Sequence, residues 1–338
     1  MTGNASPALG PPPTRRQTFR RRVGDSVTAI LVIGTMKLIL HLPERPVWAM
    51  AGLAGRISYR VSGTRRRRAR RNLRRVVEWM AAKGRGNESY RAAATDPKAL
   101  EAIVRSAFVN HAYYYVELAR APLCTTAWVK ERLFVETPEV VDEFMTERRA
   151  MILIGLHFGA IEMPGFYAVG RLGQIVAPME TVANARIQRY TFSTRATIGV
   201  RLVTLQAAAG ELLAALRRNE PVGLVADRDL TGGGIEVELF GAKTKIPAGP
   251  ALLAAETGAP MYMSTVRRAG PGRYRGCLRP VRPPEGASRK ERSRATAREE
   301  ARLFEQFISD APEQWLALFH PIWPDLDGPE SSRSGDDA

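Results

Sequence analysis

The sequence predicts an α/β fold with a mostly parallel central sheet flanked by helices and an added helical part at the N-terminus. From Ala150 onwards, short apolar runs rich in β-branched residues alternate with helical patterns, which is typical of a parallel sheet covered by helices. The residues before Ala150 carry mainly helical patterns. A chain of 338 residues is long enough for one large domain with such an addition.

The strand candidates are apolar or alternating runs bounded by turn residues. They cover residues 151–156, 174–177, 202–204, 222–226, 236–240, 261–266 and 274–278. The helices expected between them cover residues 160–169, 184–198, 209–218, 250–256 and 294–308.

Composition divides the chain into four parts. Residues 1–22 are rich in Pro, Gly, Ser and Arg and are expected to form a disordered basic arm. Residues 23–121 form the helical part, and residues 122–325 form the α/β domain. Residues 326–338 are expected to form a disordered acidic tail.

The first helix of the helical part, residues 27–42, is apolar but contains Lys37 and His41 and is closed by Pro43. It is shorter than the roughly 20 residues of a spanning helix, which favours an interfacial or core-packed helix. Further helices are expected at 46–61, 64–80 and from Asp96-Pro97 to residue 121, where an N-cap precedes a proline at the first helical position.

The net charge of +16 indicates a polyanionic partner, either nucleic acid or an anionic membrane surface. Eight arginines crowd residues 65–75, and basic residues near a membrane surface each contribute about 1 kcal/mol of attraction to anionic lipids. Apolar helices flank the cluster and no nucleic-acid-binding motif is present. Anionic membrane lipids are therefore the expected partner, and no nucleic acid is expected.

A histidine and a carboxylate follow the first strand of the α/β region, in the stretch HFGAIE. His157 lies where the apolar run turns into a helix, and Glu162 follows five positions later. Five helical steps would place the two side chains on different faces, so His157 must lie in the turn if they cooperate. A carboxylate could then orient the imidazole and leave its other nitrogen free as a base.

Three more clusters follow apolar runs. Arg186 and Arg195 lie on an expected helix, and a guanidinium can bind phosphate through two hydrogen bonds. Asp227, Arg228 and Asp229 follow a buried strand, either as an internal ion network or as part of the site. Glu236 and Glu238 share one face of a strand, and Lys243 and Lys245 follow them.

The sequence excludes several kinds of chemistry. It contains no G-x-S-x-G motif and no metal-ligand spacing, so neither a metal nor another cofactor is expected. The two cysteines, Cys124 and Cys277, lie far apart in apolar settings and fit a reducing compartment. Base catalysis by His157 with a carboxylate is the chemistry that remains.

These residues resemble a known family. HFGAIE is similar to the H-x4-D/E motif of the lysophospholipid acyltransferase superfamily, and the spacing from His157 to Arg195 and to the D-R-D at 227–229 resembles its branch of bacterial lipid A lauroyl/myristoyl acyltransferases. Residues 226–260 most resemble actinobacterial phosphatidylinositol mannoside acyltransferases, and PEQWLALFHPIWP resembles the closing motif of the family. Members of that branch often carry Asp where this chain has Glu162.

The resemblance implies transfer of a fatty acyl chain from acyl-CoA or acyl carrier protein to a sugar hydroxyl of a glycolipid. It implies a peripheral or N-terminally anchored protein on the cytoplasmic face of the cytoplasmic membrane. His157 would be the general base, Glu162 or Glu236 its orienting partner, and backbone amides after His157, with Arg195, would hold the oxyanion. Arg195, Arg186, Asp227, Arg228 and Asp229 would bind substrate.

Two other classes of protein remain open at this point. A basic nucleic-acid-binding protein would use the arginine cluster, and a non-catalytic lipid-binding protein would keep the fold without the reaction. Within the enzyme class, a lipid A-type or lysophospholipid acyltransferase is the alternative to a phosphatidylinositol mannoside acyltransferase.

Overall fold

The computed structural model describes residues 15–146, 150–229, 232–282 and 288–326. Residues 1–14 and 327–338, which contain most of the two segments predicted to be disordered, lie outside the described residues. The helix α1 (Arg15–His41) includes residues 15–22, so the prediction of disorder is wrong for that stretch. Residues 15–22 contain no proline or glycine and are rich in arginine, which favours helix.

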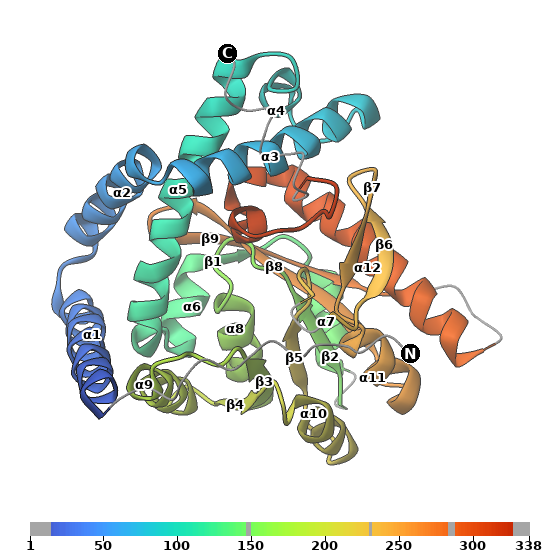
Figure 1. Cartoon of the computed structure of the whole chain (residues 1–338). Helices are drawn as coiled ribbons and strands as arrows, with labels where there is room; N and C mark the ends of the chain where they lie inside the picture. Colours follow the sequence, from blue (N-terminus) through green and yellow to red (C-terminus); the bar gives the residue numbers. More distant parts are fainter. Residues whose placement is uncertain (1–14, 147–149, 230–231, 283–287, 327–338) are drawn as a thin grey trace, which may run out of the picture.

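A seven-stranded sheet forms the centre of the molecule, as the sequence predicts (Figure 1). Its order is β1-β9-β8-β2-β5-β3-β4, and every neighbouring pair is parallel except the β8–β9 hairpin. The strands are β1 (Leu133–Val135), β2 (Ile152–Gly155), β3 (Ile175–Met179), β4 (Val200–Thr204), β5 (Val222–Val225), β8 (Met261–Gly270) and β9 (Arg273–Pro280).

The predicted strand at 236–240 is real but does not belong to this sheet. It is β6 (Ile235–Leu239), which pairs antiparallel with β7 (Ala242–Ile246), a strand that the sequence analysis missed. Both strands alternate between exposed charged residues and buried residues, so one face of the hairpin contacts the core and the other is accessible. A half-exposed antiparallel hairpin fits this alternation better than a fully buried parallel strand.

Helices cover both faces of the central sheet and create two hydrophobic cores. Along β2, Ile152 and Ile154 point into one core, and Met151 and Leu153 point into the other. The first core contacts α10 (Ala208–Arg217), α11 (Gly249–Thr257) and α12 (Arg289–Asp310). The second contacts α6 (Thr126–Arg132), α7 (Pro138–Thr146) and α8 (Met163–Leu172), while α9 (Ala185–Ala196) packs beside β4.

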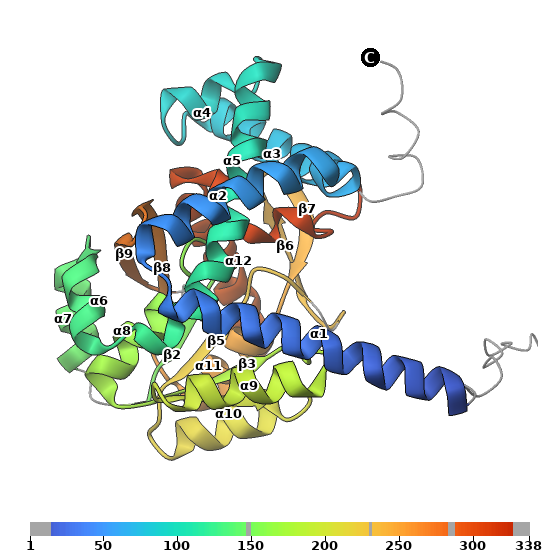
Figure 2. The ribbon, with the colours of Figure 1, turned by 90° about the vertical axis from the view of Figure 1, so that its left-hand side faces the viewer.

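The helical part packs on this α/β body through α3 (Gly63–Lys83) and α5 (Pro97–Arg120). It also contains α2 (Glu44–Val61) and the short α4 (Glu88–Ala92), which the sequence analysis did not predict. Figure 2 shows α1 and α2 running across one side of the molecule, with α9 beneath α1. In the described residues, no helix has both the length and the apolar character of a membrane span.

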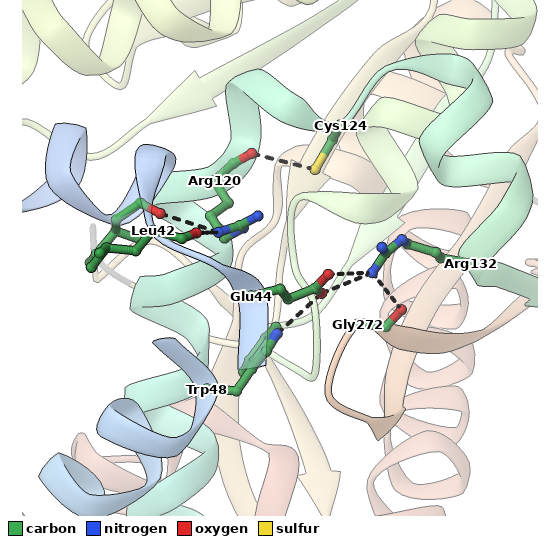
Figure 3. A network of polar contacts seen from close by, with 8 residues as sticks. Leu42, Glu44, Trp48, Arg120, Cys124, Arg132 and Gly272 are labelled. Atoms are coloured by element: carbon green, nitrogen blue, oxygen red, sulfur yellow. Dashed lines mark hydrogen bonds and ion pairs between the residues drawn. The ribbon is translucent and has the colours of Figure 1, made fainter. Parts of the chain in front are cut away.

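Two arginines fix the corner between α1 and α2, one from α5 of the helical part and one from α6 of the α/β body (Figure 3). Arg120 of α5 donates to the carbonyl oxygens of Ile39 and Leu42 at 3.2 and 3.1 Å, which satisfies free carbonyl groups at the end of α1. Arg132 of α6 binds both carboxylate oxygens of Glu44 at 2.8 and 2.9 Å. Ion pairing and carbonyl capping thus fix the corner between the two helices, while Val47 and Trp48 pack against Val116 of α5.

Several arginines of α3 have partners within the chain. Arg70 binds Glu101 at 2.7 Å, and Arg65 stacks on the ring of Phe319, whereas Arg67 is exposed. The cluster that the sequence analysis assigned to lipid attraction therefore also holds α3 against its neighbours.

Glu300 on α12 is a fully buried carboxyl group, and neither of its oxygens has a hydrogen-bond partner among the described residues. Burial raises the pKa of Glu300 to about 8. The native protein therefore keeps this proton in a pH range where the unfolded chain has released it. Stability decreases as pH rises from about 4.5 to about 8, by about 1.4 kcal/mol for each pH unit at most.

We predict that Glu300→Gln flattens this pH dependence, because the amide cannot ionise. Urea unfolding at pH 5.5 and 8 measures the difference. Glu299→Gln, one residue earlier on the more accessible side of α12, is the control and should keep the wild-type slope because Glu300 is intact. Equal slopes in the wild type and Glu300→Gln would contradict the assignment of a buried ionisable proton.

Candidate active site

The candidate site lies at the carboxyl ends of two neighbouring parallel strands. His157 follows β2 by two residues and Asp227 follows β5 by two residues. β2 and β5 pair in register, with Gly155 opposite Val225, and the amide of Ala226 donates to the carbonyl of Gly155. The register thus brings His157 and Asp227 together, at the sheet edge where ligand sites of α/β proteins collect.

His157 and Asp227 form a hydrogen-bonded pair. The Nδ1 atom of His157 lies 2.7 Å from Oδ1 of Asp227, and the backbone amide of His157 donates to the same oxygen at 3.1 Å. The indole of Trp315 donates to Oδ2 at 2.7 Å. With Nδ1 engaged, Nε2 is the nitrogen left to accept a proton.

The pKa values of His157 and Asp227 are shifted in opposite directions by their mutual interaction. Burial lowers the pKa of His157, but the Asp227 carboxylate opposes this effect, and the resulting pKa is raised. Burial raises the pKa of Asp227, but His157 and the Trp315 indole stabilise the charged form, and the resulting pKa is lowered. Asp227 therefore stays ionised and makes His157 a better proton acceptor.

The segment around Trp315 also holds the His157 loop from the other side. The amide of Leu316 donates to the carbonyl of His157 at 2.6 Å, and Phe158 forms an antiparallel bridge with Trp315. The sequence of this segment indicates no role beyond its resemblance to a closing motif.

Gly159 allows the loop to pass close to β8. Its φ is +56°, and a Cβ atom there would lie 2.0 Å from the carbonyl oxygen of Val266. The amides of Phe158, Gly159 and Ala160 donate to the carbonyls of Leu156, Gln314 and Val266. These three amides are thus occupied, and the expectation that the amides next to His157 hold an oxyanion is wrong for them.

Arg268 is the centre of a buried network behind this turn. Its guanidinium binds both oxygens of Glu117 at 2.7 Å and donates to the carbonyl of Gly159 at 2.6 Å. Its backbone N–H and carbonyl group both bond to the Gln314 side chain. Arg268 therefore supports the Gly159 turn through its side chain and the segment that carries Trp315 through its backbone.

Glu162 does not contact His157. It lies at the N-cap of α8 and accepts a hydrogen bond from Arg195 of α9 at 2.7 Å. Residues 158–162, which have bridge, bend and turn geometry, lie between His157 and the first helical residue of α8 and direct the side chains of His157 and Glu162 to different neighbours. The Arg195 side chain is buried and has almost no contact with solvent.

Glu236 also lies apart from His157, since it is on the exposed face of β6 and pairs with Lys243 at 3.2 Å. The carboxylate that contacts His157 is therefore Asp227, which the sequence analysis grouped with the substrate-binding residues. Arg186 is exposed on the first turn of α9.

The other two residues of the D-R-D group have different roles. Asp229 accepts hydrogen bonds from the amides of Gly232 and Gly234 and so shapes the glycine loop. Arg228 binds Glu180, and its buried Nε has no partner among the residues that the structure describes.

Sequence reasoning missed Trp315, Gln314 and Arg268. One signal was available for Asp227, because both it and His157 stand two residues beyond an apolar strand. Among the described residues, no group of three or more His, Cys, Asp or Glu side chains could hold a metal ion.

Comparison with known proteins adds independent findings. The family model described as bacterial lipid A biosynthesis acyltransferase matches residues 16–324. A phosphatidylinositol mannoside acyltransferase of Mycolicibacterium smegmatis is 28% identical over 244 residues, which are 71% of this chain and 75% of the relative. A phosphatidylinositol mannoside acyltransferase of Mycobacterium tuberculosis is 37% identical over 109 residues, which are 30% of this chain and 34% of the relative.

We predict that Asp227→Asn lowers the pKa of His157 relative to the wild type, because burial remains while the carboxylate is lost. A pH titration of the histidine ring signals by NMR, assigned with His157→Ala, measures this change. His111, on α5, is an internal control and should titrate as before. An unchanged or higher pKa of His157 would show that Asp227 does not set its charge.

Arg268→Met is expected to lower the free energy of unfolding by about 3–5 kcal/mol, because Glu117 is left buried without its cation. Arg267→Met is the matched control, since its pair with Glu136 is partly exposed and should contribute at most about 1 kcal/mol. Urea unfolding of both variants is the measurement, and equal losses would argue against a special role for the buried pair.

Proposed function

The chain belongs to the bacterial lipid A biosynthesis acyltransferase family, and from this premise we propose that it transfers a fatty acyl chain from acyl-CoA or acyl carrier protein to a sugar hydroxyl of a membrane glycolipid. The observation that carries the proposal is the His157–Asp227 pair at the carboxyl edge of the sheet. An acyltransferase of this kind needs a base for a hydroxyl group, and the pair provides one.

The proposed reaction uses His157 as the general base. Its Nε2 removes the proton of the acceptor hydroxyl while the oxygen attacks the thioester carbonyl. The carbon–sulfur bond then breaks, and the leaving thiolate takes the proton from the imidazolium. Asp227 holds the ring orientation and stabilises the imidazolium through the 2.7 Å contact to Nδ1.

We assign Glu162 and Arg195 a positioning role. Their ion pair links the N-terminus of α8 to α9, and so fixes the helix that follows the His157 loop. Arg186, exposed at the start of α9, remains a proposed contact for substrate.

A narrow apolar groove between α7, α8 and strands β1, β8 and β9, with a volume of about 40 Å³, is the proposed contact for one end of the acyl chain. Its walls include Phe144, Leu153, Tyr167 and Leu278. It reaches Val266, whose carbonyl accepts a hydrogen bond from Ala160, three residues after His157. A fatty chain in this groove would thus end near the catalytic loop.

The proposed membrane-facing surface is the outer side of α1 and α2. Large apolar side chains are exposed there, among them Ile30 at 65%, Leu31 at 64%, Met50 at 62% and Val61 at 75%. An apolar face next to basic residues is typical of interfacial helices. We propose peripheral or N-terminally anchored association with the cytoplasmic face of the cytoplasmic membrane, with anionic lipids as partners.

The proposed acceptor is a phosphatidylinositol mannoside, because the two relatives described above carry that activity in their names. The family description supports a lipid A-type acceptor as the second candidate.

The test is acyl transfer and acyl-CoA hydrolysis by purified His157→Ala. We expect a loss of about 10²-fold or more in both rates, as for removal of a general base. His41→Ala, at the end of α1, is the control and should stay within about twofold of the wild type. Near wild-type rates in folded His157→Ala would exclude the proposed mechanism.

A further inference from the structure

A polar cavity opens beside the catalytic pair and has no role in the mechanism above. It has a volume of about 270 Å³ and lies between the Asp227 loop, the exposed face of the β6–β7 hairpin and residues 321–324. Ligand pockets usually span about 300–1,000 Å³, so this cavity suits one ring rather than a whole lipid.

The cavity is lined by groups of both charges. Its lining contains the cations Arg228, Lys243 and Lys245 and the acidic residues Asp229 and Glu236, while Asp227 lines it with its carboxylate buried against His157. A site for phosphate alone would show an excess of positive charge. Interleaved donors and acceptors instead suit a group with several hydroxyls, because each hydroxyl both donates and accepts.

The hairpin explains why these groups face the cavity. Glu236 and Lys245 are opposite each other in the β6–β7 register, and the period of two places both on the exposed face. Val237 and Ile246 point the other way and are buried. The buried face thus fixes the strands, while the charged face is left accessible.

Arg228 provides a second observation. It lines the cavity next to Asp227, and its guanidinium donates to Glu180 at 2.6 Å. This ion pair holds the Arg228 side chain at the cavity wall.

We infer that this cavity binds the hydroxyl-rich ring of the acceptor head group, with Lys245, Glu236 and Arg228 as its polar contacts. The inference rests on the proposed function, and it goes further by giving the acceptor ring a location. The loop of Asp227 forms part of the cavity wall, and the buried Asp227 carboxylate binds His157, so a ring bound here lies next to the segment that orients the base. The carboxylate of Glu236 then serves the acceptor rather than His157.

The test compares Lys245→Met and Glu236→Gln with the matched control Glu238→Gln. Glu238 lies on the same exposed face of β6 but is not part of the cavity lining. The readout is the KM for phosphatidylinositol mannoside in detergent micelles at saturating long-chain acyl-CoA. Loss of a hydrogen bond to a charged group should raise this KM about tenfold or more in the two cavity variants, and Glu238→Gln should match the wild type.

A second measurement does not depend on turnover. Binding of the same lipid to the His157→Ala protein should weaken by a similar factor when Lys245→Met is added, and Lys245→Arg should restore most of it. An unchanged acceptor KM in folded Lys245→Met and Glu236→Gln would overturn the inference. If His157→Ala still abolishes acyl-CoA hydrolysis in that case, the proposed function stands without this location for the acceptor.

Discussion

The buried carboxylate of Asp227 ties together three parts of the chain that are far apart in sequence. It receives hydrogen bonds from the ring and amide of His157 and from the indole of Trp315. Burying an ionised carboxylate costs free energy unless hydrogen-bond donors surround it. Asp227 therefore needs these contacts to stay ionised. The ends of β2 and β5 and the segment around Trp315 must therefore fold together before His157 can act as an oriented base.

The same requirement explains the buried network behind the loop. The turn at Gly159 approaches β8 so closely that a side chain there would overlap the carbonyl of Val266. Arg268 crosses from β8 to bind the carbonyl of Gly159, while Gln314 bonds to the backbone of Arg268 and accepts from the amide of Gly159. The loop that carries His157 is thus held by β8 and by the C-terminal segment. These contacts restrict the motion of His157 more than a surface loop would.

The sequence was sufficient to predict the α/β class, most strands and His157 at a strand end, because hydrophobic periodicity and turn residues are local signals. It was not sufficient to identify Asp227 as the partner, since that depends on β2 and β5 being neighbours, and strand order is not a local property. Glu162 was the nearer carboxylate in sequence, but the bridges at Phe158 and Gly159 turn the chain before α8 begins. Likewise, the charges of β6 indicated a strand but not that it pairs with β7 outside the central sheet.

Asp227, Glu162 and Glu236 differ in solvent exposure and in their partners, and these differences determine their roles. Asp227 has no exposed surface and binds the imidazole, Glu162 binds Arg195 at a helix start, and Glu236 remains accessible on the hairpin. Only the first can alter the basicity of His157 through direct contact, since the other two have their own cations. The accessible carboxylate is the one free to exchange partners with a ligand, because its pair with Lys243 is largely exposed and such a pair contributes at most about 1 kcal/mol. The division between a buried carboxylate that orients the base and an accessible one that can meet the acceptor is therefore a consequence of solvent exposure.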